Sequence, residues 1–66
     1  MAKGKQILRR LFSMGFVLVN QVGSHRKLRH PDGRQLTFAF HDKVEVGKIA
    51  IKEIAKQAGI KLEDLV

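Results

Sequence analysis

The stretch HRKLRHPDGRQLTFAF, residues 25–40, contains two alternating segments on either side of a turn signal. Pro31 presets the backbone of the first turn position, Asp32 suits the second, and Gly33 tolerates a positive φ. Alternating apolar and polar residues are typical of strands that bury one face. The stretch therefore predicts a β-hairpin with a three-residue loop that ends in a glycine bulge.

The length of the loop decides the register of this hairpin. A three-residue loop places the apolar side chains of both strands on one face. A two-residue loop scatters them, because a slip of one residue turns every side chain over. We therefore predict the three-residue loop, with strands at about 25–30 and 34–41. The predicted pairs are His30 with Arg34, Leu28 with Leu36 and Arg26 with Phe38, and Phe40 joins the apolar face.

The opposite face of the hairpin is expected to carry histidine and basic side chains. Strand alternation assigns it His25, Lys27, Arg29, Gln35, Thr37, Ala39 and His41. In this register His25 pairs with Ala39, so His41 is expected as a diagonal neighbour of His25 at roughly 7–8 Å. His30 falls on the apolar face beside the turn, where we expect a structural role.

A helix and a strand are predicted before the hairpin. The helix covers residues 5–14, and Gly15 follows where helices commonly end in a left-handed residue. Its apolar stripe consists of Ile7, Leu8, Leu11 and Phe12. The β-branched and apolar segment Phe16–Gln21 predicts the strand.

A second helix is predicted after the hairpin, over about residues 47–58. Gly59 ends it, Ile60 makes the usual hydrophobic contact, and the tail 61–66 adds a turn. Its apolar stripe consists of Ile51, Ile54, Ala55 and Ala58. The order α-β-β-β-α predicts an α+β fold, a three-stranded antiparallel sheet with two helices packed on one face, in one domain over residues 1–66.

Composition favours a partner rich in phosphate. The 66 residues include 13 Lys and Arg against 6 Asp and Glu, a net charge of +7. Such a basic footprint is typical of nucleic-acid binding, and the alternatives are a ribosome-like structural role or solubility alone. The apolar runs are far shorter than the roughly 20 residues of a membrane helix, and the N-terminus does not resemble a signal peptide. With no cysteine, we expect a cytoplasmic domain without membrane association.

The basic face of the hairpin contains the groups needed to cleave RNA by attack of the neighbouring 2′-hydroxyl. His25 can exchange a proton near neutral pH, and Lys27 and Arg29 can hold the phosphate and offset its developing charge. Gly23 leaves room for an RNA backbone, and Ser24 can make a hydrogen bond. A surface histidine without a catalytic role is the alternative.

Two other kinds of site are weakly supported. His25 and His30 face opposite sides of one strand, and a pair of His25 and His41 would lack a third metal ligand. We therefore expect no metal or cofactor. The segment IAIKEIAKQAGIKLEDL, residues 49–65, resembles the opening of a helix-turn-helix, but only residues 61–66 remain for its recognition helix.

Several short motifs in a fixed order resemble the HicA toxin family over about Lys5–Ile60. They are the GF strand start, the GSH step, the HPDGR hairpin, the FAFH strand, the GK helix start and the KQAGI helix end. The resemblance implies a fold like that of double-stranded RNA-binding domains and metal-independent cleavage of messenger RNA. It also implies that His25 is the functional residue and that a HicB-type antitoxin covers the active face. The segment EVGKI departs from relatives, which often have Pro-Lys-Gly-Thr there, since Ile49 replaces the threonine.

The expected RNA site consists of His25 as catalytic acid or base, with Gly23, Ser24, Lys27, Arg29 and His41 as RNA contacts. His41 is a candidate for the acid that protonates the leaving 5′-oxygen, and water is the alternative. The second hypothesis is a non-catalytic RNA-binding module of the same fold, which would use Lys27, Arg29 and the helix lysines. A DNA-binding regulator is the third.

Overall fold

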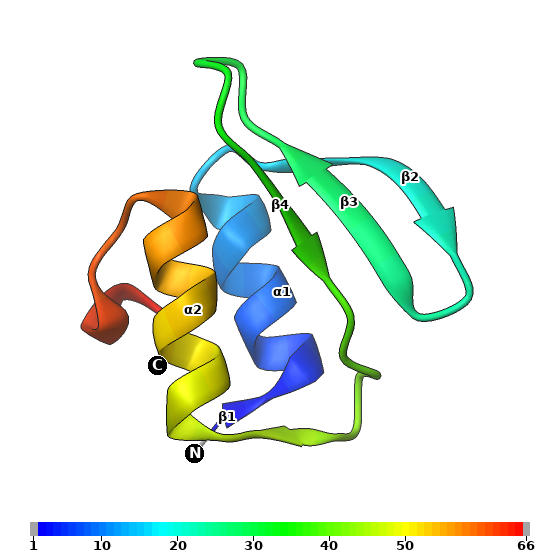
Figure 1. Ribbon diagram of the computed structural model, residues 1–66, viewed down its shortest axis with the longest axis vertical. Helices are drawn as coiled ribbons and strands as arrows, with labels where there is room; N and C mark the ends of the chain where they lie inside the picture. Colours follow the sequence, from blue (N-terminus) through cyan, green and yellow to red (C-terminus); the bar gives the residue numbers. More distant parts are fainter. Residues whose placement is uncertain (1, 66) are drawn as a thin grey trace.

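The computed structural model describes residues 2–65, and in it a layer of two helices packs against an antiparallel sheet (Figure 1). The elements are β1 (Ala2–Lys3), α1 (Gly4–Ser13), β2 (Val17–Val22), β3 (His25–Arg29), β4 (Gln35–Phe38), β5 (Glu45–Val46), α2 (Lys48–Ala58) and the 3₁₀ turn η1 (Leu62–Asp64). The main sheet has the order β2-β3-β4, and β1 pairs with β5 in a second, two-stranded sheet. The predicted α+β fold is confirmed. The β1–β5 pair was not predicted, because two-residue strands carry no alternation.

The predicted hairpin loop and register are confirmed. The His30 amide donates to the Arg34 carbonyl at 2.8 Å, and the Gly33 amide donates to the His30 carbonyl at 2.9 Å. Gly33 has a φ of +101°, which explains the glycine at this position. The observed pairs include Leu28 with Leu36 and Arg26 with Phe38.

The strand predicted over residues 34–41 is too long. β4 ends at Phe38, and Arg26 with Phe38 is the last pair of its ladder. The predicted pair of His25 with Ala39 is therefore not part of the sheet, and His41 is not a diagonal neighbour of His25 in it. Both of these expectations were wrong.

The first turn of α1 explains why β4 ends early. The Lys5 amide donates to the Asp42 carbonyl at 3.1 Å, and the Gly4 amide donates to the Val44 carbonyl at 2.9 Å. Helix N-termini leave their first amides without an intrahelical acceptor, so the chain after β4 supplies carbonyls to them. Residues 41–44 consequently turn away from the sheet and lie against α1.

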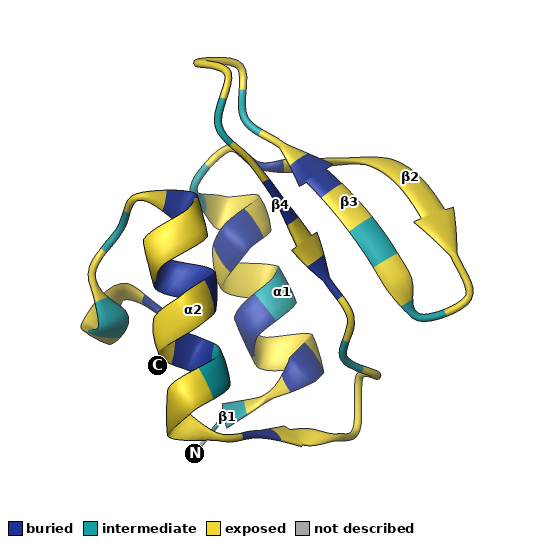
Figure 2. Ribbon diagram, viewed as in Figure 1, coloured by how far each residue is buried: buried dark blue, intermediate teal, exposed yellow. Residues whose placement is uncertain are grey.

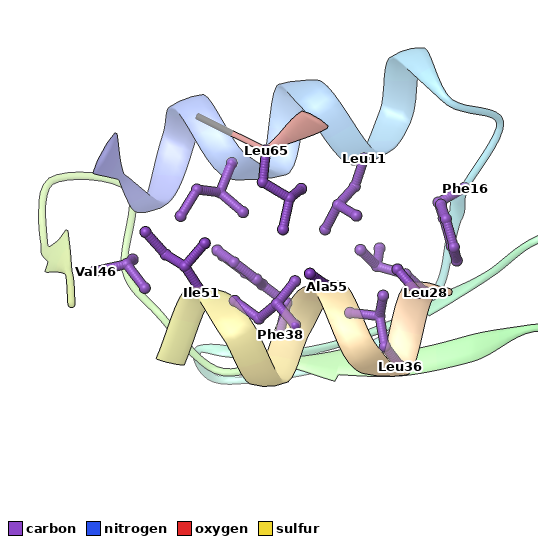
Figure 3. Close-up of a cluster of buried hydrophobic side chains, with 12 residues drawn as sticks. Leu11, Phe16, Leu28, Leu36, Phe38, Val46, Ile51, Ala55 and Leu65 are labelled. Atoms are coloured by element: carbon purple, nitrogen blue, oxygen red, sulfur yellow. The ribbon is translucent and has the colours of Figure 1, made fainter. Parts of the chain in front are cut away.

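The hydrophobic core lies between the two helices and strands β3 and β4 of the main sheet (Figure 3). It consists of Ile7, Leu11, Phe16, Leu28, Leu36, Phe38, Val46, Ile51, Ile54, Ala55, Ala58 and Leu65. All four residues predicted for the stripe of α2 are buried. In α1 the prediction was wrong for Phe12, which is 43% exposed, because it lies about 100° around the helix from the buried Leu11.

β2 extends beyond the helices, and all six of its residues are exposed (Figure 2). The strand predicted at Phe16–Gln21 is confirmed, with both ends shifted by one residue to Val17 and Val22. A β-bulge between Leu18 and Asn20 shifts its register on β3. β-branched residues favour an extended backbone whether or not they are buried, so the pattern could not show that this strand lacks helical cover.

Arg34 fastens the tip of the hairpin to α2. One guanidinium nitrogen donates to the carbonyl of Ala58 at 2.5 Å, at the C-terminal end of α2. The guanidinium also lies 5.3 Å from the ring centroid of Phe16, and its Nε donates to Asp32 at 2.8 Å. A cation at a helix C-terminus is favoured by the helix dipole, so this contact helps to fix the hairpin relative to the helices.

His30 fastens the same loop to α1, which agrees with the structural role expected for it. Its Nε2 lies 3.0 Å from the carbonyl of Met14, and its ring packs edge-on against Phe16 with centroids 5.1 Å apart. The loop between β3 and β4 is therefore tied to the C-terminal ends of both helices.

The C-terminal part of the chain follows the prediction. Gly59 has a φ of +69°, and the Ile60 amide donates to the Ala55 carbonyl at 3.0 Å, which closes the end of α2. The predicted turn in the tail is η1, and Leu65 after it is buried. Within residues 2–65, no recognition helix follows α2, so the helix-turn-helix alternative loses its essential element.

Gly4→Ala is expected to destabilise the fold by about 1–3 kcal/mol, since the added Cβ would collide with the carbonyl oxygen of His41. Elsewhere in a helix the same substitution usually stabilises by up to about 1 kcal/mol. Gly47→Ala is the control for steric collision, because a Cβ there meets no atom within 4 Å and the φ of Gly47 is −71°. Gly47 is the N-cap of α2, so this variant should lose only the difference between Gly and Ala at a cap, up to about 1 kcal/mol. Urea denaturation measures both variants, and a Gly4→Ala protein as stable as wild type would contradict the prediction.

Asp32→Ala is expected to lower the thermal unfolding midpoint near neutral pH but not in strong acid. Hydrogen bonds from the backbone amide and side chain of Arg34 hold the pKa of Asp32 below its ordinary value of 3.8. Because the folded-state pKa is the lower one, the carboxylate stabilises the fold above that ordinary value, and its contribution disappears as the pH falls through the folded-state pKa. Melting curves across the acid range test this, and a difference from wild type that did not change with pH would refute it.

Candidate nucleic-acid interface

The face of the sheet that points away from the helices, here called the open face, carries the predicted row of basic side chains. His25, Lys27 and Arg29 alternate along β3 and are all exposed. Ladder pairing places Val22, Asn20 and Val17 of β2 beside them on one side, and Thr37 and Gln35 of β4 on the other. The structure thus brings together five of the seven residues predicted for this face, and leaves Ala39 and His41 outside the strand.

Strand geometry separates the three members of this row. Each residue advances about 3.3 Å along a strand, so Lys27 lies roughly 7 Å from His25 and Arg29 roughly 13 Å. His25 and Lys27 can therefore approach one phosphate group from the same side. Arg29 is far enough from His25 to contact a different phosphate of the same nucleic-acid strand.

The row is free to bind an external anion. Within residues 2–65, neither Lys27 nor Arg29 takes part in a salt bridge. Arg26, on the other side of the same strand, lies 3.2 Å from the Asp42 carboxylate and 3.5 Å from the carbonyl oxygen of Phe40. Alternation along β3 therefore separates a structural arginine from two cations whose charge faces solvent.

A two-residue turn, Gly23 and Ser24, precedes His25. Gly23 has a φ of +61°, and the space where its Cβ would be contains no atom within 4 Å. The Gln21 side chain donates to the carbonyl of Gly23 at 3.1 Å and supports the turn. The turn is thus open to solvent at Gly23, and the approach of an RNA backbone there stays a prediction.

His41 lies on a different element from His25. Its carbonyl accepts the Val44 amide at 3.2 Å in the turn that follows β4, and the same carbonyl packs against Gly4 of α1. The side chain is exposed. His41 is therefore positioned by the contact with α1 rather than by the sheet that carries His25.

A shallow hollow of about 240 Å³ opens to solvent beside the basic row. Its lining consists of Lys27, Gln35, Leu36, Thr37 and Gln57. Gln57 was not among the predicted site residues, because its helical position indicates only an exposed side chain. The packing of α2 beside β4 brings Gln57 to this hollow at the edge of the sheet, next to Lys27 and Thr37, where amides and hydroxyls can hydrogen-bond to a base.

Two kinds of feature are absent from the described residues. Nowhere in residues 2–65 do three His, Asp or Glu side chains come together as ligands for a metal ion. The same part of the chain contains no helix with the length and apolar character needed to cross a membrane.

Residues 4–60 match the family model for the HicA toxin of bacterial toxin–antitoxin systems. The chain belongs to the HicA toxin family. The match runs from the first residue of α1 to the residue after the cap of α2, so it includes the whole main sheet and its open face. Comparison with individual curated proteins gives no match. Membership in a toxin–antitoxin family implies that this HicA toxin has an antitoxin partner.

Proposed function

We propose that this HicA toxin is a metal-independent endoribonuclease that cleaves messenger RNA in the cytoplasm, with His25 as its catalytic acid or base. The observation that carries the proposal is the row on β3, in which an exposed histidine is followed by two cations without salt bridges, within residues 2–65. The proposed RNA contacts are Gly23, Ser24, Lys27, Arg29 and His41.

The chemistry is transfer of the phosphoryl group to the neighbouring ribose hydroxyl. The neutral imidazole of His25 removes the proton from the 2′-hydroxyl, and the oxygen attacks the adjacent phosphorus. The bond from phosphorus to the 5′-oxygen then breaks, and that oxygen takes up a proton. The products are a 2′,3′-cyclic phosphate and a free 5′-hydroxyl, and no metal ion is required for any of these steps.

The basic residues have different tasks in this scheme. Lys27 is close enough to His25 to offset the charge that develops on the reacting phosphate. Arg29, farther along β3, holds a neighbouring phosphate and aligns the strand, because a guanidinium binds phosphate in a bidentate manner. Gly23 admits the RNA backbone, and the hydroxyl of Ser24 supplies one hydrogen bond.

The proton for the leaving oxygen has two candidate sources, His41 and water. Because His41 belongs to the turn held against α1, it does not share a strand pair with His25. This placement favours water as the proton donor and favours an RNA contact as the role of His41.

A non-catalytic RNA-binding module is the second candidate function. The open face suits it as well, since cations and amides at a shallow surface can bind RNA through shape and backbone contacts. The two functions differ in one respect that can be measured, because only the enzyme needs His25 for turnover.

His25→Ala is expected to reduce the rate of cleavage of a long single-stranded RNA by about 10²–10⁴-fold, as loss of an acid–base group typically does. Affinity for RNA and the circular dichroism spectrum should stay close to wild type, because the side chain is exposed. Cleavage is followed on gels with excess chelator present, and His41→Ala is measured in parallel to identify the proton donor.

A fully active His25→Ala protein would refute the catalytic assignment. If neither protein cleaves but both bind RNA equally, the binding-module hypothesis gains support. A repeat with ribosome-bound message then distinguishes that module from an enzyme that acts only during translation.

The double variant Lys27→Gln/Arg29→Gln is expected to weaken RNA binding and to reduce its dependence on salt. Each phosphate contact on single-stranded RNA contributes about 0.7 to the slope of log affinity against log salt, so the slope should fall by about 1.4. Fluorescence anisotropy with labelled RNA at several salt concentrations measures it. The matched control, Lys5→Gln/Lys52→Gln, removes the same charge from the helical layer. An equal effect of the two variants would place RNA on the helices instead.

A further inference from the structure

β2 combines two unusual features, exposure and the absence of charge. Residues 11–25 include no Lys, Arg, Asp or Glu, although the chain has 19 such residues in all, 13 basic and 6 acidic. Four apolar side chains of this strand, here called the apolar edge, face solvent. They are Val17, Leu18, Val19 and Val22, which are 52%, 44%, 44% and 70% exposed. An exposed strand that is apolar and uncharged is a site where another chain can dock.

The apolar edge borders the basic row directly. Val22 lies opposite His25 and Val17 lies opposite Arg29 in the ladder between β2 and β3. Neighbouring strands are about 4.8 Å apart, so a molecule that covers the open face meets an uncharged line, the two valines with Asn20 between them, beside a line of cations. Leu18 pairs with the buried Leu28 and is exposed on the other face of the sheet. These two lines require different chemistry from whatever binds them.

RNA is chemically complementary to the line of cations but not to the valines of β2. Its affinity comes from phosphate contacts with cations and from stacking of bases on aromatic rings or guanidinium planes. Valine offers neither a charge nor a flat π surface. A protein with apolar side chains next to Asp or Glu matches both lines, because the apolar groups pack on β2 while the acids pair with the basic row.

A second copy of this chain matches poorly. Two copies would each bring a net charge of +7, and a two-fold contact across the open face would place identical cationic surfaces together. Such like-charge contact is unfavourable. The charge of the chain therefore points to an acidic partner.

The apolar edge is suited to side-chain packing rather than to the addition of a strand. The Gln21 amide already donates to the side chain of Asn20 at 2.9 Å, and the Gln21 side chain is bonded to Gly23. The bulge between Leu18 and Asn20 interrupts the strand further. A partner strand would have to displace these contacts, whereas the four apolar side chains are accessible without any rearrangement.

We propose that the apolar edge is a docking element for an acidic protein partner and that it contributes to binding the antitoxin but not to binding RNA. This inference deepens the proposed function and rests on it for the identity of the open face as the RNA site. The antitoxin then inhibits by packing apolar groups on β2 and, at the same time, placing carboxylates over Lys27 and Arg29. Toxin recognition by the antitoxin and by RNA is thereby separable at the level of single residues.

The test uses the double variant Val17→Gln/Val22→Gln, whose positions are exposed and whose charge is unchanged. The probe is the cognate antitoxin, purified separately and titrated by calorimetry. We expect the variant to lose about 10–100-fold in affinity for the antitoxin, which corresponds to one or two lost apolar contacts at about 1.4 kcal/mol per tenfold. RNA affinity and the rate of RNA cleavage should equal those of wild type.

Ile49→Gln is the matched control, because Ile49 is 82% exposed but lies on α2, away from the sheet. It should not change affinity for the antitoxin. Salt provides a second readout: the loss caused by the valine substitutions should persist at high salt, while the loss caused by Lys27→Gln/Arg29→Gln should shrink as ions screen the charges.

Unchanged antitoxin affinity in the valine variant would overturn the proposal. So would an equal loss of RNA affinity, which would assign the apolar edge to the RNA site. The proposal would also be overturned if sedimentation showed that the wild-type protein is a dimer and that the valine substitutions dissociate it. The apolar edge would then bind a second copy of this chain. If wild-type toxin cleaves neither free nor ribosome-bound RNA, the proposed function fails, but the calorimetric comparison still decides the docking proposal because it does not depend on cleavage.

Discussion

The three-residue loop at residues 31–33 is the constraint on which the rest of this structure depends. Gly33 closes the loop with a φ of +101°, and the closure pairs Leu28 with Leu36. Alternation then assigns every side chain of β3 and β4 to a face. One face completes the core, and the other presents His25 and the cations to solvent. A loop one residue shorter would divide the apolar side chains of β3 and β4 between the two faces, so the same turn determines both stability and the chemistry of the open face.

The contacts at the hairpin tip turn this local choice into a tertiary arrangement. Arg34 bonds to the last turn of α2, and His30 bonds to the chain at the end of α1, so the loop and the two helices hold each other in place. The helices consequently cover β3 and β4 and leave β2 outside (Figures 1 and 2). The open face and the apolar edge both result from this incomplete cover. The helices pack on one face of the sheet only, and the sheet is wider than the helical layer, so β2 stays exposed.

The candidate site was partly predictable, because three of its residues belong to a single strand. His25, Lys27 and Arg29 lie on one strand, and alternation within a strand is a local property that a sequence displays directly. His41 was placed wrongly because its position depends on the amides of α1, which attract the chain after β4 away from the sheet. Gln57 was missed because only the packing of α2 beside β4 brings it to the hollow next to Lys27. Residues of one element could be predicted together, and residues joined by packing could not.

The sequence by itself determined the type and order of the main elements, the hairpin register, the stripe of α2 and the split of β3 into a core side and a basic side. Each of these follows from short-range rules: the period of a strand or helix, and the φ that a glycine permits. Only the tertiary structure decided where β4 ends, that β1 pairs with β5, that Phe12 stays half exposed and that β2 has no helix over it. These features depend on contacts between segments distant in the chain, such as Lys5 with Asp42 and Arg34 with Ala58. Such contacts form because helix ends leave backbone amides and carbonyls without hydrogen-bond partners. Which distant segment supplies the partner cannot be read from a local sequence pattern.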